Sequence, residues 1–211
     1  MKLLRKIKKP FMVSITLLII CGIIYPAFMT GVSQILFKDK ANGSIIYADG
    51  KAVGAEYVGQ EFTDARFMHG RPSAYNYNTY TLEQKENGEY SGPSSGSNNY
   101  APSNPKLLER VNDDVDKILS ENPTVKKQDI PADLVTESGS GLDPHISEQA
   151  AKIQLDRISK ETGISAHELE NIVKNNTSGK VLGIFGENTV NVLGVNLDIA
   201  KKLGIVNNIQ K

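Results

Sequence analysis

A long apolar run near the start of the chain limits its fold more than any other feature of the sequence. Residues 11–37, from Phe11 to Phe37, contain no charged side chain. Roughly 20 apolar helical residues cross a bilayer core about 30 Å thick, and a single span in lipid must satisfy its backbone hydrogen bonds internally. The run therefore predicts one transmembrane helix over residues 11–37.

The charges on either side of the run predict its orientation. Five basic residues precede it, namely Lys2, Arg5, Lys6, Lys8 and Lys9. The charged cluster that follows, at residues 38–40, is weaker. Because basic residues favour the cytoplasmic side, residues 1–10 are predicted to be a cytoplasmic N-terminus and residues 38–211 a soluble extracytoplasmic domain. A cleaved signal peptide is the alternative, but it would have a shorter apolar region and a small-residue cleavage site, and the run shows neither.

Three residues inside the run are candidates for contacts with other membrane helices. Pro26 cannot donate a backbone hydrogen bond, so a kink is expected there. Gly22 and Gly31 would let a neighbouring helix approach closely, although glycine is also simply common in transmembrane helices.

The distribution of charge is uneven. The chain has 24 basic and 24 acidic residues, and all of the acidic ones follow Phe37. The outer part therefore holds 19 basic and 24 acidic residues, a net charge of −5. This balance argues against nucleic acid as a partner. The one cysteine, Cys21, lies inside the run, so no disulfide is expected in the outer domain.

Turn and cap signals predict that the outer part is one mixed domain of the α+β class. Asp49-Gly50 predicts a hairpin between strands at 42–47 and 53–58. Further strands are expected near 133–136, at 179–185 and at 189–193. Helices are expected at 105–119, from an N-cap at Ser147 to Gly163, after a capping box formed by Ser165 and Glu168, and at 196–203.

Residues 74–104 are predicted to be a long surface loop, because they are rich in Tyr, Asn, Ser and Gly and poor in aliphatic side chains. One interpretation is an unstructured insertion. The other is a loop that contacts a partner, since tyrosines are frequent at interfaces. The tyrosines concerned are Tyr75, Tyr77, Tyr80, Tyr90 and Tyr100. The sequence favours neither interpretation.

The segment 138–145 contains residue types that occur in catalytic and anion-binding sites. Ser138, Asp143 and His145 could in principle form a nucleophilic site, but a triad normally assembles from separate elements, and one short loop is more typical of turn chemistry. The glycines of Ser138 to Gly141 could expose backbone N–H groups to an anion. A tight turn that needs the conformational freedom of glycine is the favoured interpretation of this loop.

Several short motifs of the chain are specific in combination. They are Gly70 to Ala74, Gly96 to Asn98 with Pro102 to Pro105, Pro131 to Thr136, Ser138 to Ser147, and Val190 to Leu193. Together with the single N-terminal helix, they closely resemble the KdpC family, the C subunits of the Kdp potassium-transporting P-type ATPases of bacteria and archaea. The resemblance covers essentially the whole chain. It departs from the family at Ser95, where a second glycine is usual, and at residues 99–100, which look like a one-residue insertion.

The resemblance implies a non-catalytic subunit of an ATP-driven potassium uptake complex in the cell membrane. In the family, a potassium-channel-like A subunit binds the ion, a B subunit hydrolyses ATP through a phospho-aspartate, and a small F subunit helps to hold the complex together. The family role implied for this chain is to raise the ATP affinity of the B subunit. ATP would then be its ligand, with Ser138, Gly139, Ser140 and Gly141 as the nucleotide contact. The alternative is a structural cap on the outer face of the A subunit without nucleotide contact.

The family motifs also supply candidate residues for partner contacts. With the three residues of the apolar run, these candidates are Gly22, Pro26, Gly31, Arg71, Asn98, Asn104, Asp143 and His145. No metal site is expected, because the three histidines lack the spacing of metal ligands.

The predicted topology conflicts with a nucleotide contact. ATP is cytoplasmic, whereas the charges around the apolar run predict that the domain lies outside. The topology has more weight, because it rests on five charges and a complete span.

Overall fold

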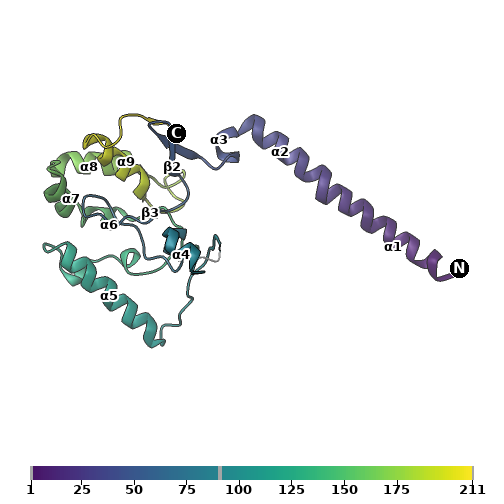
Figure 1. The fold of residues 1–211 in the computed structure, drawn as a ribbon, viewed down its shortest axis with the longest axis horizontal. Coiled ribbons are helices and arrows are strands. Elements are labelled where there is room, and N and C mark those ends of the chain that lie inside the picture. Colours follow the sequence, from purple (N-terminus) through teal and green to yellow (C-terminus); the bar gives the residue numbers. More distant parts are fainter. Residues whose placement is uncertain (1, 90–91, 211) are drawn as a thin grey trace. The chain divides into compact units, whose positions relative to one another are not determined.

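The computed structural model describes residues 2–89 and 92–210, so Tyr90 lies outside the described residues. The chain divides after Ser44 into two compact units (Figure 1).

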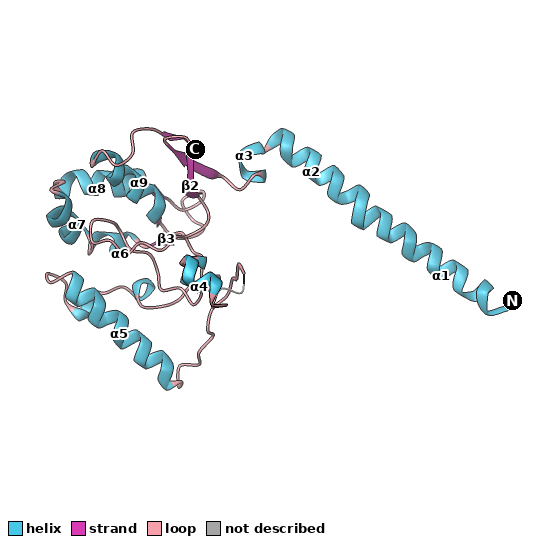
Figure 2. Ribbon diagram, in the orientation of Figure 1, coloured by secondary structure: helices cyan, strands magenta, loops and turns pink. Residues whose placement is uncertain are grey.

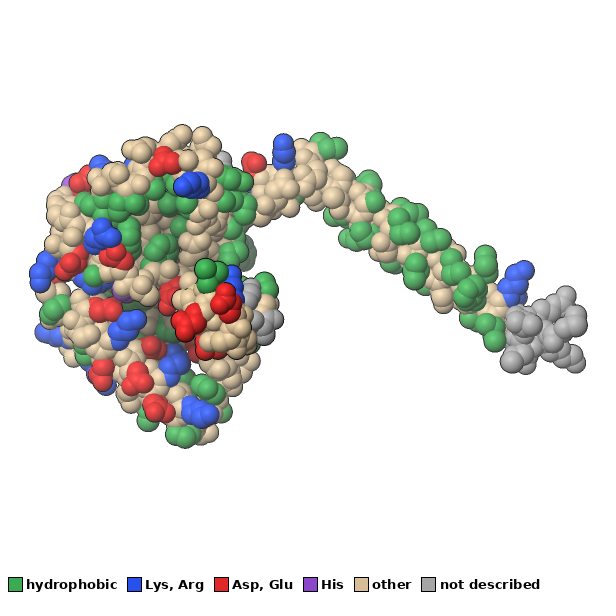
Figure 3. Space-filling model, in the orientation of Figure 1, with side chains coloured by type: hydrophobic (Ala, Val, Ile, Leu, Met, Phe, Trp, Pro, Cys, Tyr) green, Lys and Arg blue, Asp and Glu red, His purple; other side chains and the backbone are tan. Residues whose placement is uncertain are grey.

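The N-terminal unit is helical almost throughout. It contains α1 (Lys2–Ile19), a π-helical turn (Ile20–Ile24), α2 (Tyr25–Leu36) and the short α3 (Lys38–Ala41). The stretch Ile7–Leu36 is 30 residues long with a mean hydropathy of 2.3, and it is long and apolar enough to cross a membrane. Hydrophobic side chains cover this helix along its length (Figure 3). The structure confirms the single apolar N-terminal helix predicted from the sequence.

The π-helical turn lies directly before Pro26. The N–H of Tyr25 bonds to the carbonyl of Ile20, five residues earlier, instead of the usual four. Helices often depart from regular geometry at proline, which cannot donate a backbone hydrogen bond. The kink expected at Pro26 stays a prediction, and the irregularity that the structure shows is a π turn that includes Gly22 and ends before Pro26.

The C-terminal unit, residues 45–211, contains two small antiparallel sheets. The first has the order β2-β1-β6, formed by β1 (Ile45–Ala48), β2 (Lys51–Ala55) and β6 (Ile209–Gln210). Ala48 pairs with Lys51 across Asp49 and Gly50, which both have positive φ (49° and 77°). Positive φ at both central residues is typical of the tight turns of hairpins. The predicted hairpin is confirmed, although its strands lie at 45–48 and 51–55 and not at the predicted 42–47 and 53–58.

The second sheet has the order β3-β5-β4 and differs from the predicted strands. It is formed by β3 (His145–Ile146), β4 (Thr177–Ser178) and β5 (Thr189–Asn191). The strand predicted at 179–185 is wrong, because β4 ends at Ser178 and only an isolated bridge joins Val181 to Phe185 beyond it. The strand predicted at 189–193 is too long, because Asn191 accepts a hydrogen bond from the N–H of Gly194 (2.8 Å) and starts a helix there.

The main helices of this unit are α5 (Pro105–Glu121), α6 (Glu148–Lys152), α7 (Leu155–Thr162), α8 (Ala166–Asn175) and α9 (Val192–Lys202) (Figure 2). Asn104, Ser147 and Ser165 cap α5, α6 and α8 as N-caps. Two predictions need correction. The single helix expected from Ser147 to Gly163 is interrupted at residues 153–154, and the strand expected near 133–136 is a short 3-10 helix (Ala132–Leu134).

Helix α9 connects the two parts of the hydrophobic core. Eight of its 11 residues are buried, and the helix begins earlier than the predicted 196–203. Val192, Val195 and Ile199 belong to the main core with α6, α7 and α8. Leu193 and Leu197 instead pack with Ile46 of β1 in a second, smaller cluster. The burial of both faces explains why α9 has little amphipathic pattern in the sequence.

The long loop at 74–104 contains more structure than predicted. Residues Leu82–Glu86 form helix α4, which has a complete capping box between Thr81 and Gln84. Asn78 holds Ser94 through two hydrogen bonds of 3.0 and 2.9 Å. The loop is therefore attached to itself and to the rest of the domain, and its role as a partner contact stays a prediction.

Candidate functional site

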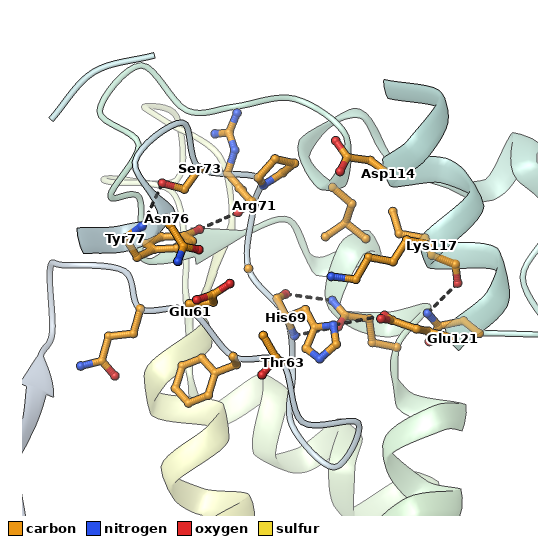
Figure 4. Close-up of a pocket in the computed structure, with 18 residues that line it drawn as sticks. Glu61, Thr63, His69, Arg71, Ser73, Asn76, Tyr77, Asp114, Lys117 and Glu121 are labelled. Atoms are coloured by element: carbon orange, nitrogen blue, oxygen red, sulfur yellow. Dashed lines mark hydrogen bonds and ion pairs between the residues drawn. The ribbon is translucent and has the colours of Figure 1, made fainter. Parts of the chain in front are cut away.

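A polar cavity of about 160 Å³ lies between the segment 60–77 and helix α5 (Figure 4). Its acidic and basic side chains, histidine included, come from the two facing walls. They are Glu61, His69 and Arg71 on one wall and Asp114, Lys117 and Glu121 on the other. A cavity of this size holds several water molecules. Its mixed charges suit small polar molecules or water better than an apolar ligand.

His69 connects the two walls of the cavity. Its ring Nδ1 lies 3.3 Å from the Glu121 carboxylate, and its Nε2 lies 3.3 Å from the carbonyl of Asp64. Its backbone N–H donates to Gln154 Oε1 (2.8 Å), and Gln154 Nε2 donates back to its carbonyl (3.1 Å). Burial and the nearby Arg157 guanidinium lower the pKa of His69, although Glu121 opposes this shift. The neutral imidazole is thus favoured inside the domain.

Arg157 is a buried cation beneath this wall. Its guanidinium donates to the carbonyls of Ala65 and Phe67, the second at 2.9 Å, and to Gln154 Oε1 at 2.8 Å. Burial lowers the pKa of Arg157, whereas Glu121 and Glu161 oppose this shift. Arginine remains charged in proteins, so these acceptors compensate for its burial. Arg157 and Gln154 therefore hold the backbone that carries His69.

Arg71 and Asp143 form the centre of a second polar group beside the cavity. Arg71 Nη1 donates to Asp143 Oδ2 at 3.0 Å, and its Nη2 donates to the carbonyls of Thr136 and Glu137, both at 3.3 Å. The N–H of His145 donates to Asp143 Oδ1 at 3.0 Å. Burial raises the pKa of Asp143, but the hydrogen bonds from His145 and Arg71 outweigh it and lower the pKa below its usual range.

Tyr77 attaches the long loop to this group. Its hydroxyl donates to the carbonyl of Arg71 at 2.7 Å. Burial, together with the charge of Asp143, raises the pKa of Tyr77 to about 12. The phenol therefore remains a hydrogen-bond donor across the physiological pH range.

The Ser138–Gly141 loop is held from two sides. The carbonyl of Gly141 accepts a bond from Ser73 Oγ (2.6 Å), and the carbonyl of Ser140 accepts from the N–H of Gly96 (2.8 Å). Inside the loop, the N–H of Gly141 donates to Ser138 Oγ (2.9 Å). Gly141 has φ +65°, and a Cβ there would lie 2.6 Å from the Gly96 carbonyl oxygen. Glycine is therefore required at Gly141 for both conformation and space.

Gly139 differs from Gly141. A Cβ added at Gly139 would meet no atom within 4 Å. One side of the loop is therefore open, and the other side is packed against residues 73 and 96.

The structure brings together most of the partner-contact candidates of the domain. Arg71 and His145 each donate a hydrogen bond to the carboxylate of Asp143. Asn98 joins them through Glu137, since its side-chain amide donates to Glu137 Oε1 at 2.8 Å. Asn104 has a different role as the N-cap of α5, where it accepts from the N–H of Lys106 at 3.0 Å.

The residues considered for catalysis do not form a nucleophile–base pair. Ser138 is buried and its hydroxyl bonds to the Gly141 N–H and faces Ser140 Oγ. His145 Nδ1 lies 3.6 Å from Asp143. Among the residues that the structure describes, no hydrogen bond joins the imidazole of His145 to a serine hydroxyl.

The three candidates in the N-terminal unit lie on exposed helix. Gly22 is in the π turn, Pro26 follows it, and Gly31 is in α2. A Cβ at Gly22 or Gly31 would meet no atom of this chain within 4 Å. Both glycines therefore leave room beside the helix.

Several residues of the site were not found from the sequence. Gln154, Arg157 and Asn196 are polar, buried, and bonded to backbone groups of the segment 65–69. Each lies within an apolar helical pattern, for example between Ile153, Leu155 and Ile158. A polar residue on a predicted buried face was the available signal, because such a group needs a hydrogen-bond partner.

Comparison with known proteins gives a consistent result over nearly the whole chain. The family model described as "K+-transporting ATPase, c chain", KdpC, matches residues 7–201. A potassium-transporting ATPase KdpC subunit of Clostridium kluyveri is 59% identical over 201 residues, covering 95% of this chain and 96% of that protein. The KdpC subunit of Clostridioides difficile is 54% identical over 96% of this chain and 100% of its own length, and that of Bacillus cytotoxicus is 45% identical over 89% and 91%.

Proposed function

Because this chain belongs to the KdpC family, the c chains of K+-transporting ATPases, we propose that it is a non-catalytic assembly and regulatory subunit of an ATP-driven potassium uptake complex. The observation that supports this most strongly is the extent of the match. It covers both the apolar helix and the domain, so the relatives share the whole architecture and not one motif.

We further propose that the partners are the potassium-channel-like A subunit, the ATP-hydrolysing B subunit and the small F subunit. The apolar helix supports a contact within the membrane, because Gly22 and Gly31 leave space for another helix. In the domain, the group around Arg71 and Asp143 supports a contact surface. It holds three separate segments, near residues 71, 98 and 143, in one arrangement.

The proposed topology places the N-terminus in the cytoplasm and the domain outside. Its support is the cluster of five basic residues before the apolar stretch. A variant with Cys21→Ser and Leu108→Cys tests it, because Leu108 is 65% exposed. A membrane-impermeant thiol reagent should label this variant in intact cells. Labelling only after the membrane is opened would contradict the proposed side.

Assembly can be tested with a matched pair of arginine variants. Arg71→Gln removes the bonds to Asp143 and to two backbone carbonyls, and should reduce co-purification with the other subunits. Arg66→Gln is the control, because Arg66 is exposed and contacts its neighbours in the chain, Asp64 through hydrogen bonds and Phe67 through its ring. Equal co-purification of the two variants would count against the Arg71 group. Deletion of residues 2–37 should abolish co-purification altogether.

A nucleotide contact is the second candidate, and it concerns the Ser138–Gly141 loop. The open side of Gly139 favours it, since a ligand could approach the backbone there. The internal bonds of the Gly141 and Leu142 N–H groups leave fewer donors for a phosphate. This function, raising the ATP affinity of the B subunit, also requires the domain to lie in the cytoplasm.

Photolabelling separates this candidate from a structural cap on the A subunit. Sealed, right-side-out vesicles that contain the complex are exposed to an azido-ATP. Labelling of this subunit only after permeabilisation supports the nucleotide contact. Absence of labelling on both sides supports the cap without nucleotide contact.

A further inference from the structure

The connection between β4 and β5 carries an unusual group of exposed hydrophobic side chains. Four of the five residues from 181 to 185 are large and apolar, and we name these four the apolar tip. They are Val181 (67% exposed), Leu182 (84%), Ile184 (75%) and Phe185 (64%). Single exposed hydrophobic residues are common on protein surfaces, but such a cluster in one tight turn usually marks an interaction site.

The backbone of the apolar tip holds these side chains outward. Val181 and Phe185 exchange two hydrogen bonds, with Val181 N donating at 2.8 Å and Phe185 N at 3.0 Å. Leu182 and Gly183 at its end have φ of +55° and +73°. A left-handed conformation is unfavourable for a residue other than glycine, and asparagine or glycine would suit it better. Leu182 is therefore unfavourable both for local folding and for solubility, which points to a use outside the fold.

The hairpin that carries the apolar tip is attached to the start of the domain at its opposite end. Asn191, at the end of β5 away from the tip, donates its side-chain amide to the carbonyl of Glu56 (2.8 Å). Glu56 follows Ala55, the residue that pairs with Ile45. Tyr57 and Val58, 55% and 44% exposed, follow Glu56 in the chain and add further apolar surface. The first residue of the domain and the strand that follows the tip are thus neighbours.

The covalent connection limits how far the start of the domain lies from the end of the apolar helix. Eight peptide steps join Phe37, at the end of the apolar helix, to Ile45. Even a fully extended chain of this length spans only roughly 28 Å, at about 3.5 Å per residue. Ile45, beside which the hairpin of the tip is attached, therefore stays within that distance of Phe37.

We propose that the apolar tip inserts into the boundary between the headgroups and the acyl chains of the bilayer. Lipid is the occupant we favour because the tip offers only aliphatic and phenyl groups, with no side-chain hydrogen-bond donor or acceptor from Val181 to Phe185. Lys180 beside it can lie among the headgroups, and a second, shallow attachment adds to that of the helix. The proposal needs no partner subunit and holds for either side of the membrane.

Tryptophan fluorescence tests this directly, because the chain has no tryptophan of its own. The full chain with Phe185→Trp is reconstituted into vesicles of phosphatidylcholine and phosphatidylglycerol, with and without bromine on the acyl chains. We expect a blue-shifted emission that the brominated lipid quenches. The full chain with Leu108→Trp is the control, since Leu108 on α5 is equally exposed at 65%. Its emission should be that of an indole in water and remain unquenched.

A second variant separates insertion from folding. Leu182→Asn with Ile184→Ser, combined with Phe185→Trp, should keep or raise the unfolding temperature, because asparagine suits a positive φ, and should reduce the quenching. The proposal would be overturned if the Phe185→Trp emission were not quenched, or if the Phe185→Trp and Leu108→Trp emissions were quenched equally. Quenching that stays unchanged in the combined variant would overturn it too. A blue shift that appears only when the other subunits are added would also overturn it, in favour of a protein partner.

Discussion

At the scale of single residues, buried polar side chains organise this domain. Asn196 on α9 bonds to both backbone groups of Met68, with Met68 N donating at 2.7 Å and the amide donating back at 2.9 Å. Gln154 does the same for His69, and Arg157 holds Ala65 and Phe67. The segment 65–69 belongs to no helix or strand, so the side chains of Gln154, Arg157 and Asn196 replace the backbone partners that a strand or helix would supply.

The loss of Arg157 should therefore be costly. Arg157→Leu removes the donor to the part-buried carbonyls of Ala65 and Phe67 and to the buried Oε1 of Gln154. We expect a loss of about 2–4 kcal/mol in the free energy of unfolding, measured by urea denaturation. Arg66→Leu, at an exposed position, should change the stability little. Similar effects of the two variants would contradict a structural role for Arg157.

His69 should make stability depend on pH. Its pKa in the folded domain is lowered by burial and by Arg157, against an unfolded value of about 6.5. Below the unfolded value the unfolded chain binds more protons, so the stability that His69 contributes above pH 6.5 is lost as the pH falls through the folded value. Glu121 and Lys117 also face this ring.

The measurement is the unfolding temperature between pH 7.5 and 5.5. His69→Gln should show a smaller decrease over this range than the original chain. His167→Gln, at an exposed position, should keep the original slope. Asp64 does not contribute to the slope in this range, because the hydrogen bonds from Arg66 lower its pKa to about 2. Identical slopes in all three proteins would show that His69 is not the responsible group.

At the scale of elements, single residues of the Ser138–Gly141 loop and of the start of helix α9 make a local hydrogen bond and a contact with a distant segment at the same time. Asn191 starts α9 with a local cap, yet its amide also bonds Glu56, 135 residues away. In the same way, Gly141 forms a local turn with Ser138 and also packs against Gly96.

Two alanine substitutions in this loop should have different effects. Gly141→Ala places a Cβ 2.6 Å from the Gly96 carbonyl oxygen at a positive φ, and we expect a loss of about 2 kcal/mol or more in unfolding free energy. Gly139→Ala meets no atom within 4 Å and should change the stability by less than about 0.5 kcal/mol. Chemical denaturation of both variants tests this difference. A comparable loss in both would mean that the packing against Gly96 is unimportant.

At the scale of the whole molecule, the two units depend on different solvents. The described part of the N-terminal unit contributes no residue to either hydrophobic cluster, and no part of its apolar stretch is buried. The domain has its own core, centred on α9. The helix is thus suited to lipid and the domain to water.

Residues 42–211 should consequently fold without the helix. We expect this fragment to unfold in one cooperative transition by calorimetry, at a temperature close to that of the domain in the full chain in detergent. A broad transition, or the loss of near-ultraviolet circular dichroism, would show that the helix is needed for the fold.

Features that depend on neighbouring residues or on the solvent could be predicted from the amino-acid sequence. The apolar helix, the Asp49-Gly50 hairpin, and the N-caps Ser147 and Ser165 all follow from local backbone chemistry or from transfer into lipid. The family motifs also indicated Arg71, Asp143 and His145, which the structure brings together.

Contacts between distant segments became visible with the three-dimensional fold. The cavity between residues 60–77 and α5, the bonds of Arg157 to a segment about 90 residues away, and the break between α6 and α7 have no local signal. The physical reason is that a buried polar side chain takes whichever backbone group the fold places beside it. A sequence pattern reveals the need for such a partner, but the packing of the core selects it.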